Sequence, residues 1–238
     1  MKSPYGLNIV DNCTTCPVRE QHLFCNLSPA AAQRLNEITS PAVYPRDAIL
    51  FIEGQLGRGA FVLCGGKAKL STTSREGKTI ITKISDHGDV LGLNATISSR
   101  PYEVTAEMVE TGQANFIAAD ALLQFLRDYG EVAIQAAKQL SCNYYSAFEE
   151  IRTLGLANSP RQKLAKVLLG WSAERVESNR SLRLRLGLTH EEIADMIGTS
   201  RETVSRLFSD FKRKKFIQSE GSSLVILDKS ALEGMVQA

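Results

Sequence analysis

Long apolar runs are missing from this 238-residue sequence. No stretch approaches the ~18 consecutive apolar residues that a membrane-spanning helix needs. The first residues, MKSPYGLNIVDN, also lack the charged and then apolar pattern of a secretory signal. Both absences argue against a membrane or secreted protein, and we expect a cytoplasmic location with no membrane partner.

Histidine is scarce, and its three copies lie far apart in the sequence, at His22, His87 and His190. The sequence shows no Ser/His/Asp arrangement, no paired acids and no glycine-rich phosphate loop, which are patterns that indicate common catalytic sites. We therefore expect that the protein is not an enzyme.

A large excess of one charge is absent as well, since the formal net charge is +2. The distribution is uneven, however. Residues 1–150 carry 13 basic and 16 acidic side chains, whereas residues 151–238 carry 15 and 10. This distribution fits a sensor joined to a module that binds phosphate groups.

A helical hairpin is predicted near the C-terminus. Thr189 and Glu192 have the spacing of a capping box, so a first helix should begin there. Gly198 would end this helix, and the hydroxyls of Thr199 and Ser200 can cap a second one. The second helix should then continue into a run of four basic residues.

The second helix should have one apolar and one polar face. The apolar stripe consists of Val204, Leu207, Phe208 and Phe211. The side chains that we expect to read DNA bases are Arg201, Glu202, Ser205 and Arg206. Arginine pairs with guanine in the major groove, and glutamate accepts a hydrogen bond from cytosine. The alternative is an amphipathic hairpin whose polar face only meets water, but the two caps, the short turn and the exposed arginines together favour DNA.

The segment GTSRETVSRLFSDFKRKKFI resembles the helix-turn-helix signature of the Crp/Fnr family of bacterial transcription regulators. Glu202, Ser205 and Arg206 match the pattern of the Fnr branch, and Arg201, Glu202 and Arg206 that of the Crp branch. The resemblance implies a homodimer on an inverted repeat, with half-sites near TTGAT or TGTGA. Ser205 favours TTGAT. RNA polymerase is a further implied partner.

A function without DNA is the alternative from another class. The chain would then be a ligand- or redox-sensing regulatory protein whose C-terminal domain binds a protein partner.

Three cysteines lie in a polar N-terminal stretch, at Cys13, Cys16 and Cys25, with His22 before the last. An odd number of thiols in a cytosolic protein does not indicate a disulfide framework. Cys-x2-Cys is typical of iron or zinc ligands, and Cys25 could be a third ligand. Free thiols are the other alternative. In that case the segment is held by apolar side chains, namely Leu23, Phe24 and Leu27.

The resemblance adds a cofactor to this cysteine pattern. In oxygen-sensing Fnr proteins a similar set holds a [4Fe-4S] cluster, completed by one more cysteine before the long helix. Here the position that aligns with the fourth ligand is Asn115, and the gap before Cys25 is longer than in that branch. A fourth ligand could be Cys64, in a predicted strand, or a water or small molecule; Cys142 lies in a predicted helix.

Short apolar runs punctuated by glycine follow from residue 41 to about residue 117. Their regular spacing predicts an antiparallel β-roll. The runs are residues 48–52, 60–64, 67–70 and 79–84. The resemblance implies the same architecture, a cyclic-nucleotide-binding-like jelly roll.

The pocket residues depart from those of a cyclic-nucleotide site. Gly92 is in place, but Leu93 occupies the position of the glutamate that holds the ribose, and Tyr102 and Glu103 lie near the Arg-Ser pair that holds the phosphate. A carboxylate beside a phosphate is repulsive, so we expect that cyclic AMP is not the effector. Arg100 is expected in a surface turn, where it could serve as a displaced anion ligand.

Helix-forming residues dominate from residue 119 to residue 156, and one set alternates spacings of three and four. This seam consists of Ile134, Ala137, Ser141, Tyr144, Phe148 and Ile151. The pattern fits packing on the chain's own roll or on a second copy, and the resemblance favours a two-fold dimer helix.

A domain boundary is predicted at residues 155–160, where Ser159 and Gln162 can form a capping box. Residues 181–186 alternate as a strand, and residues 216–227 predict the hairpin of a winged helix. The expected phosphate contacts are Arg183, Arg185, Thr189, Thr199 and Ser200. For the two strand arginines a solvated face is the alternative.

The predicted fold class is α+β in four segments. They are a cysteine-containing segment (1–30), a sensor β-roll (31–118), a dimerisation helix (119–156) and a winged helix-turn-helix (157–238).

Overall fold

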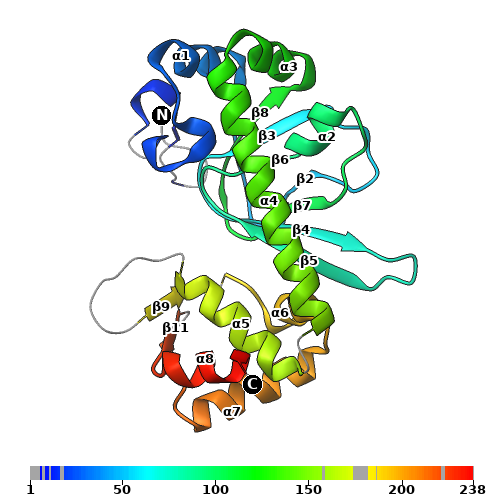
Figure 1. Ribbon diagram of the computed structural model, residues 1–238, viewed down its shortest axis with the longest axis vertical. Coiled ribbons are helices and arrows are strands. Elements are labelled where there is room, and N and C mark those ends of the chain that lie inside the picture. The colour runs from blue at the N-terminus through cyan, green and yellow to red at the C-terminus, as the bar shows by residue number, and fades with distance from the viewer. Residues whose placement is uncertain are drawn as a thin grey trace. The chain divides into compact units, whose positions relative to one another are not determined.

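The α+β architecture appears in the computed structural model as helices and antiparallel sheets in two compact units (Figure 1). The structure describes residues 6, 9–10, 12–16, 19–156, 159–173, 182–185, 187–220 and 223–237. The first unit is Met1–Gly77 with Ile81–Ala147, and the second is Lys78–Ile80 with Phe148–Ala238. No helix within the described residues is long and apolar enough to cross a membrane.

Two four-stranded antiparallel sheets form the roll of the first unit. In spatial order, one contains β1 (Thr39–Tyr44), β8 (Gly112–Ala118), β3 (Gly59–Leu63) and β6 (Val90–Leu91). The other contains β2 (Ile49–Phe51), β7 (Thr105–Met108), β4 (Ala68–Thr73) and β5 (Thr79–Ser85). Each apolar run that predicted a strand forms one, and β3 is buried along its whole length. The predicted roll is therefore confirmed.

Helices surround this roll. Three short 3-10 helices, η1 (Cys13–Thr15), η2 (Arg19–Gln21) and η3 (Leu23–Cys25), precede α1 (Pro29–Ile38). The later helices are α2 (Leu93–Ser98), α3 (Ala119–Asp128) and α4 (Gly130–Leu156).

The helical region from residue 119 to residue 156 is interrupted, which corrects the prediction of one helix. Tyr129 has an extended backbone, with φ −125° and ψ 95°, and Gly130 follows it. Glycine costs ~1 kcal/mol in a helix relative to alanine, so the break falls beside the weakest helix former. The ring of Tyr129 packs on Phe125 with 5.3 Å between ring centroids, which holds the break in place.

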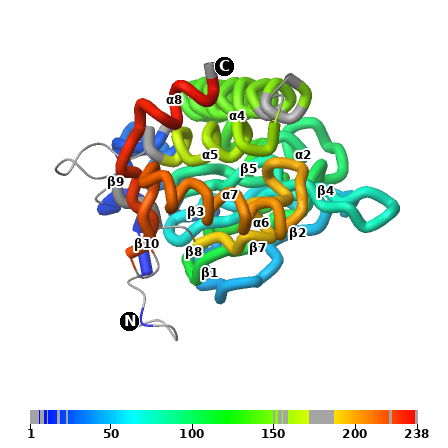
Figure 2. The backbone as a smooth tube through the Cα atoms, turned by 90° about the horizontal axis from the view of Figure 1, so that it is seen from below, coloured from blue at the N-terminus to red at the C-terminus, as the bar shows by residue number. Residues whose placement is uncertain are grey.

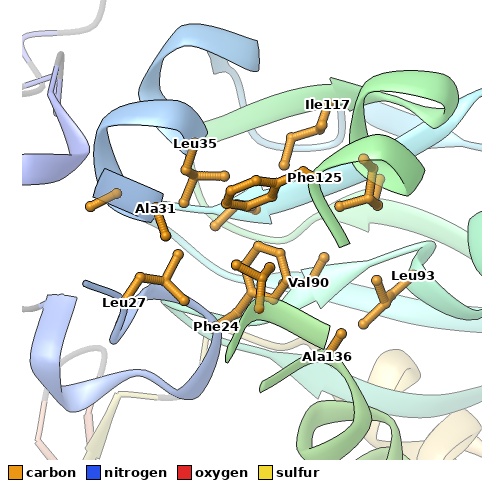
Figure 3. Packing of buried hydrophobic residues seen from close by; sticks show 14 residues of the cluster. Phe24, Leu27, Ala31, Leu35, Val90, Leu93, Ile117, Phe125 and Ala136 are labelled. Carbon is orange, nitrogen blue, oxygen red and sulfur yellow. The ribbon is translucent and has the colours of Figure 1, made fainter. Parts of the chain in front are cut away.

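The N-terminal segment is anchored in the main core of this unit (Figure 3). Phe24 and Leu27 are 0% and 6% exposed, and they pack with Leu35 of α1, Phe125 of α3 and Val90 of β6. Burial of an aromatic side chain of this size stabilises a fold by ~1.5–3 kcal/mol. Cys25, which lies between these anchors in the sequence, is thus held against the roll.

The second unit contains the predicted winged helix-turn-helix. Its elements are α5 (Pro160–Ala173), β9 (Leu182–Arg185), α6 (His190–Ile197), α7 (Arg201–Arg213), β10 (Ile217–Glu220), β11 (Ser223–Ile226) and α8 (Lys229–Gln237). The strands form one antiparallel sheet in the order β10-β11-β9. Helix α8, which the sequence reasoning did not predict, lies beside α5 (Figure 2).

The start of α5 has the predicted capping box. The Gln162 backbone N–H donates to Ser159 Oγ at 3.3 Å, and the Ser159 N–H donates to Gln162 Oε1 at 3.1 Å. Leu164 and Leu168 of this helix are fully buried against α6 and α7 side chains such as Ile193. These contacts give the second unit its own core.

Candidate nucleic-acid interface and cysteine cavity

The capping box of α6 forms as the sequence predicted. Thr189 Oγ1 accepts from the Glu192 N–H at 3.2 Å, and the Glu192 carboxylate accepts from the Thr189 N–H at 2.7 Å. Gly198 then ends the helix with φ 64°, a left-handed conformation in which glycine carries no steric penalty. The turn into α7 is therefore fixed by local sequence.

Helix α7 begins at one of the two predicted hydroxyl caps. Ser200 is the N-cap, and its Oγ accepts from the Thr203 N–H at 3.3 Å. Thr199 lies in the turn, where its backbone N–H donates to Ala194 O at 3.0 Å. Ser200 thus satisfies one N–H group in the first turn of α7, at the end of the helix whose dipole attracts anions.

The two faces of α7 are separated as the helical periodicity predicted. Val204, Phe208 and Phe211 are 0%, 3% and 0% exposed in the second core. Arg201, Glu202 and Arg206 are exposed on the opposite side. The helix therefore presents two guanidinium groups and one carboxylate to whatever binds that surface.

Ser205 differs from its predicted neighbours because it is half-buried. Its Oγ lies 2.9 Å from Nδ1 of His190, and the His190 ring stacks on Phe208 with 4.8 Å between centroids. A hydroxyl can both donate and accept, so this contact leaves Ser205 able to bind a second group. His190 links α6 to α7, a role that sequence reasoning missed.

Electrostatics favour a neutral His190 and an ionised Glu202. Burial lowers the pKa of His190, and the positive charges of Lys212 and Arg201 lower it further. Hydrogen bonds from its own N–H and from the Ser200 hydroxyl lower the pKa of the Glu202 carboxyl. A hydrogen-bond acceptor with a fixed charge thus stands at the start of α7.

The remaining predicted phosphate contacts lie on β9, where the register pairs Arg183 with Val225 and Arg185 with Ser223. The predicted strand is thereby confirmed. The side chains of both arginines lie outside what the structure describes, so their role stays a prediction.

Four cysteines line one cavity in the first unit. We call it the cysteine cavity, and its lining residues are Val10, Cys13, Cys16, Arg19, His22, Cys25, Ala32, Leu35, Thr39, Val62, Cys64, His87 and Asn115. The structure thus brings the three predicted ligands together and adds Cys64 from the end of β3. Cys142, in contrast, is exposed on α4.

Side-chain amides hold the first cysteine segment against the roll. The Cys13 N–H donates to Oδ1 of Asn36 on α1 at 3.0 Å. Gln113 of β8 accepts from the Val10 N–H at 2.7 Å and donates to Val10 O at 3.0 Å, as a strand partner would. These contacts satisfy backbone groups that would otherwise be costly to bury.

The thiols of Cys13, Cys25 and Cys64 have raised pKa values. Burial raises the pKa of Cys25 to about 12, and the neighbouring Cys13 and Cys16 add to the effect. Burial also raises the pKa of Cys64 and of Cys13. Nucleophilic sensor cysteines have lowered pKa values instead, so these thiols are poor candidates for direct reaction with peroxide.

Two histidines complete the rim of the cavity. The rings of His22 and His87 stack with 4.6 Å between centroids and 10° between planes. Gly88 permits this stack, because any Cβ at that position would collide with the His22 ring. Burial lowers the pKa of His87, and the charge of His22 lowers it further.

No three His, Cys, Asp or Glu side chains among the described residues converge on one point as a single metal ion requires. A tetrahedral zinc ion binds all its ligands at one centre. In a [4Fe-4S] cluster each thiolate binds a different iron, so the sulfurs stand apart. Such a cluster takes four cysteine ligands, and four cysteines line this cavity.

The residues predicted for an effector pocket lie in different surroundings, although Gly92 packs against the ring of Tyr102. Leu93 is 1% exposed in one core cluster, and Tyr102 is 4% exposed in another, where its hydroxyl donates to Gly59 O at 2.7 Å. Arg100 and Glu103 are exposed. A hollow of the roll is lined by Tyr102 together with Phe51, Phe61, Phe116 and Arg58. The other four predicted pocket residues do not line this hollow.

The predicted dimer seam is exposed on α4. Its large apolar side chains are Ile134, Tyr144, Phe148 and Ile151, which are 59%, 64%, 52% and 65% exposed. The opposite face of α4, with Val132 and Ala136, is buried in the core of the first unit. Contacts with the chain's own roll are therefore made by a different face from the seam.

Both units match known domain families. Residues 41–129 match the cyclic nucleotide-binding domain, and residues 162–235 match the Crp-like helix-turn-helix domain. Fold and site thus define a regulator that joins a cyclic-nucleotide-binding-like roll to a helix-turn-helix. The chain belongs to the Crp/Fnr family of DNA-binding transcription regulators.

Two relatives illustrate the range of this family. The CRP-like cAMP-activated global transcriptional regulator of Mycobacterium tuberculosis is 28% identical over 212 residues, which cover 88% of this chain and 94% of that protein. The transcriptional activator protein anr of Pseudomonas aeruginosa is 23% identical over 223 residues, covering 93% and 91%.

Solved structures show the same fold. FixK2 from Bradyrhizobium japonicum has a TM-score of 0.75 at 18% identity and covers 84% of this chain and 98% of its own. A CooA mutant from Carboxydothermus hydrogenoformans has a TM-score of 0.71 at 21% identity, with 84% and 88% covered.

Proposed function

We propose that this protein is a cytoplasmic homodimeric regulator that binds an inverted repeat with half-sites near TTGAT and acts without catalysis. The cysteine cavity senses a redox signal through a [4Fe-4S] cluster, and cyclic AMP is not the effector. The dimer bound to DNA contacts RNA polymerase. Each part has its own support in the molecule.

The polar face of α7 carries the DNA proposal. Arg201, Glu202 and Arg206 are exposed together on the first two turns of the helix, while its other face is fixed in the core. A rigid helix with such a face fits the major groove, which is where base edges differ most.

The exposed seam of α4 supports the homodimer. A run of apolar side chains at heptad spacing favours a second helix of the same kind, and a two-fold pair buries the same patch on both chains. The two copies of α7 in such a dimer would lie about 34 Å apart, which is one turn of DNA. Because the copies are related by a two-fold axis, the site that they read would be an inverted repeat.

The sensor proposal is supported by the donor set. Cys13, Cys16 and Cys25 line one cavity, held by Asn36 and Gln113. A bound cluster would supply reversible one-electron chemistry and sensitivity to oxygen. The absence of a cyclic-nucleotide site is supported by Leu93, whose buried side chain belongs to the core and offers no hydrogen-bond acceptor.

Gel-shift titrations with Glu202→Ala test the DNA proposal. This variant should lose discrimination at one position of the half-site by ~1–3 kcal/mol, because only one base contact is removed. Glu233→Ala, which removes the same charge at an exposed position of α8, is the matched control and should bind like wild type. Equal losses on specific and random duplexes for Glu202→Ala would contradict base reading. No binding to any inverted repeat, with or without oxygen, would favour a protein partner instead.

A further inference from the structure

Cys64 joins the cysteine cavity from a part of the chain remote from the other three thiols. It directly follows β3, and its backbone N–H donates to Gln113 O of β8 at 2.8 Å. It packs against the main core of the first unit, as do Cys13 and Cys25. The roll itself therefore fixes the backbone of Cys64, whereas the other thiols lie in η1, directly after it, or in η3.

The strand register explains why Cys64 reaches the cavity. Strand β3 pairs with β8 so that Val62 lies opposite Asn115 and Leu63 opposite Ala114. Alternate residues of a strand share a face, so Cys64 projects on the same side as Val62 and therefore as Asn115. All three line the cysteine cavity. Cys64 and Asn115 are thus neighbouring positions on two adjacent strands.

Asn115 cannot supply a thiolate, and its side chain is already engaged. Its Oδ1 accepts from Gln113 Nε2 at 2.8 Å, and the residue is 2% exposed. The sulfur donors of the cavity are therefore Cys13, Cys16, Cys25 and Cys64, which is the number of cysteine ligands that a [4Fe-4S] cluster takes.

Packing also holds the side chain of Cys64 at the wall of the cavity. Its Sγ lies 3.6 Å from Val62 O, and apolar core residues pack against it. A cysteine binds iron as the thiolate. Ligation would therefore release the thiol proton to solvent.

We propose that Cys64 is the fourth protein ligand of the cluster, so that a single chain completes the ligand set. This inference rests on the proposed [4Fe-4S] cofactor. It differs from a three-cysteine site in that no iron is left to a water or small molecule.

Anaerobic reconstitution with ferrous iron and sulfide tests the proposal in the full-length protein. Wild type should bind about four irons and four sulfides per chain. Cys64→Ser should retain less than half of the wild-type iron and visible absorbance. Cys142→Ser, which removes the thiol exposed on α4, is the matched control and should equal wild type. Wild-type iron, sulfide and absorbance in Cys64→Ser would overturn the proposal.

A relocated ligand separates lost ligation from lost folding. Adding Asn115→Cys to Cys64→Ser places a thiol on the same face of the adjacent strand, and it should restore iron and sulfide to the wild-type level. Circular dichroism identifies any variant that fails to fold, and Cys64→Ala then replaces Cys64→Ser in both arms. A folded double variant that stays as low in iron as the single one would contradict a ligand role for Cys64.

Two failures can be told apart in this design. Equal iron in wild type and Cys64→Ser would contradict the role of Cys64 as the fourth ligand but not the presence of the cluster. Wild type that binds no iron removes the cluster and this proposal together, while the gel-shift titrations still decide DNA binding independently.

Discussion

The helix-turn-helix is built from residues close together in the sequence, whereas the cysteine cavity is built from residues far apart in it. The first is built from consecutive residues, with Thr189, Gly198 and Ser200 setting the ends of two adjacent helices. The second collects thiols from η1, η3 and the end of β3. A recognition surface of the first kind is already shaped by local contacts, whereas a site of the second kind exists only while the roll is folded. The sensor should therefore respond more strongly to changes in packing.

The largest effect is expected from a substitution in the seam of α4, which should abolish DNA binding and leave the cysteine cavity intact. Phe148→Asp places two charges near the two-fold axis, so it should yield monomers and abolish binding to paired half-sites. Iron content should be unchanged, because the cavity lies within one chain. Sedimentation and gel shifts measure the first two effects. Cys142→Asp, also exposed on α4 but outside the seam, is the control, and a variant Phe148→Asp that remains dimeric would contradict the assigned interface.

A pair of core substitutions sharpens the contrast between the units. Phe211→Ala and Phe24→Ala each remove a fully buried aromatic ring and should cost ~3–5 kcal/mol of folding free energy. Phe211→Ala should be detected by the fluorescence of Trp171, the single tryptophan, which packs in the second core. Phe24→Ala should lower iron binding instead, because it loosens the segment that carries Cys25. The reverse assignment of the two effects would contradict the separate cores.

Loss of a cap gives a smaller effect that is confined to the second unit. Ser200→Ala removes the side chain that accepts from the Thr203 N–H, and it should cost ~1 kcal/mol. Urea unfolding followed through Trp171 measures the change. Thr199→Ala is the control, since Thr199 is not the N-cap, and a larger loss for Thr199→Ala would contradict the observed start of α7.

The smallest effect concerns pH. The folded chain holds the pKa of His190 below its ordinary value of 6.5, so the unfolded chain takes up the proton first as the pH falls. Stability of the second unit should therefore be fully present above pH 6.5 and decline below it. His190→Gln should weaken this dependence when unfolding is followed through Trp171. An identical pH dependence in wild type and His190→Gln would assign it to other groups.

The helix ends and the apolar face of α7 could be predicted from the sequence because the residues that determine them are close together in it. The capping boxes of α5 and α6 and the stripe ending at Phe211 all lie within one or two helical turns, and the structure confirms them. The break at Tyr129 was missed because helix-forming residues continue on both sides of it.

The cysteine cavity, whose residues are far apart in the sequence, could be predicted only in part. Three cysteines close in sequence suggested a cluster, but the arrival of Cys64 depends on the register of β3 and β8. The stacking of His22 on His87 and the contact between His190 and Ser205 likewise depend on tertiary packing. No spacing rule relates such residues, because each pair is set by the fold and not by helical or strand periodicity.

Selection of bound sequences from a pool of randomised duplexes tests the central claim most directly. Reconstituted protein should enrich an inverted repeat whose two half-sites resemble TTGAT, with centres about one DNA turn apart. The Glu202→Ala variant should enrich the same repeat with one half-site position relaxed. A pool that shows no common sequence, or a single unpaired half-site, would contradict a homodimer that reads DNA through α7.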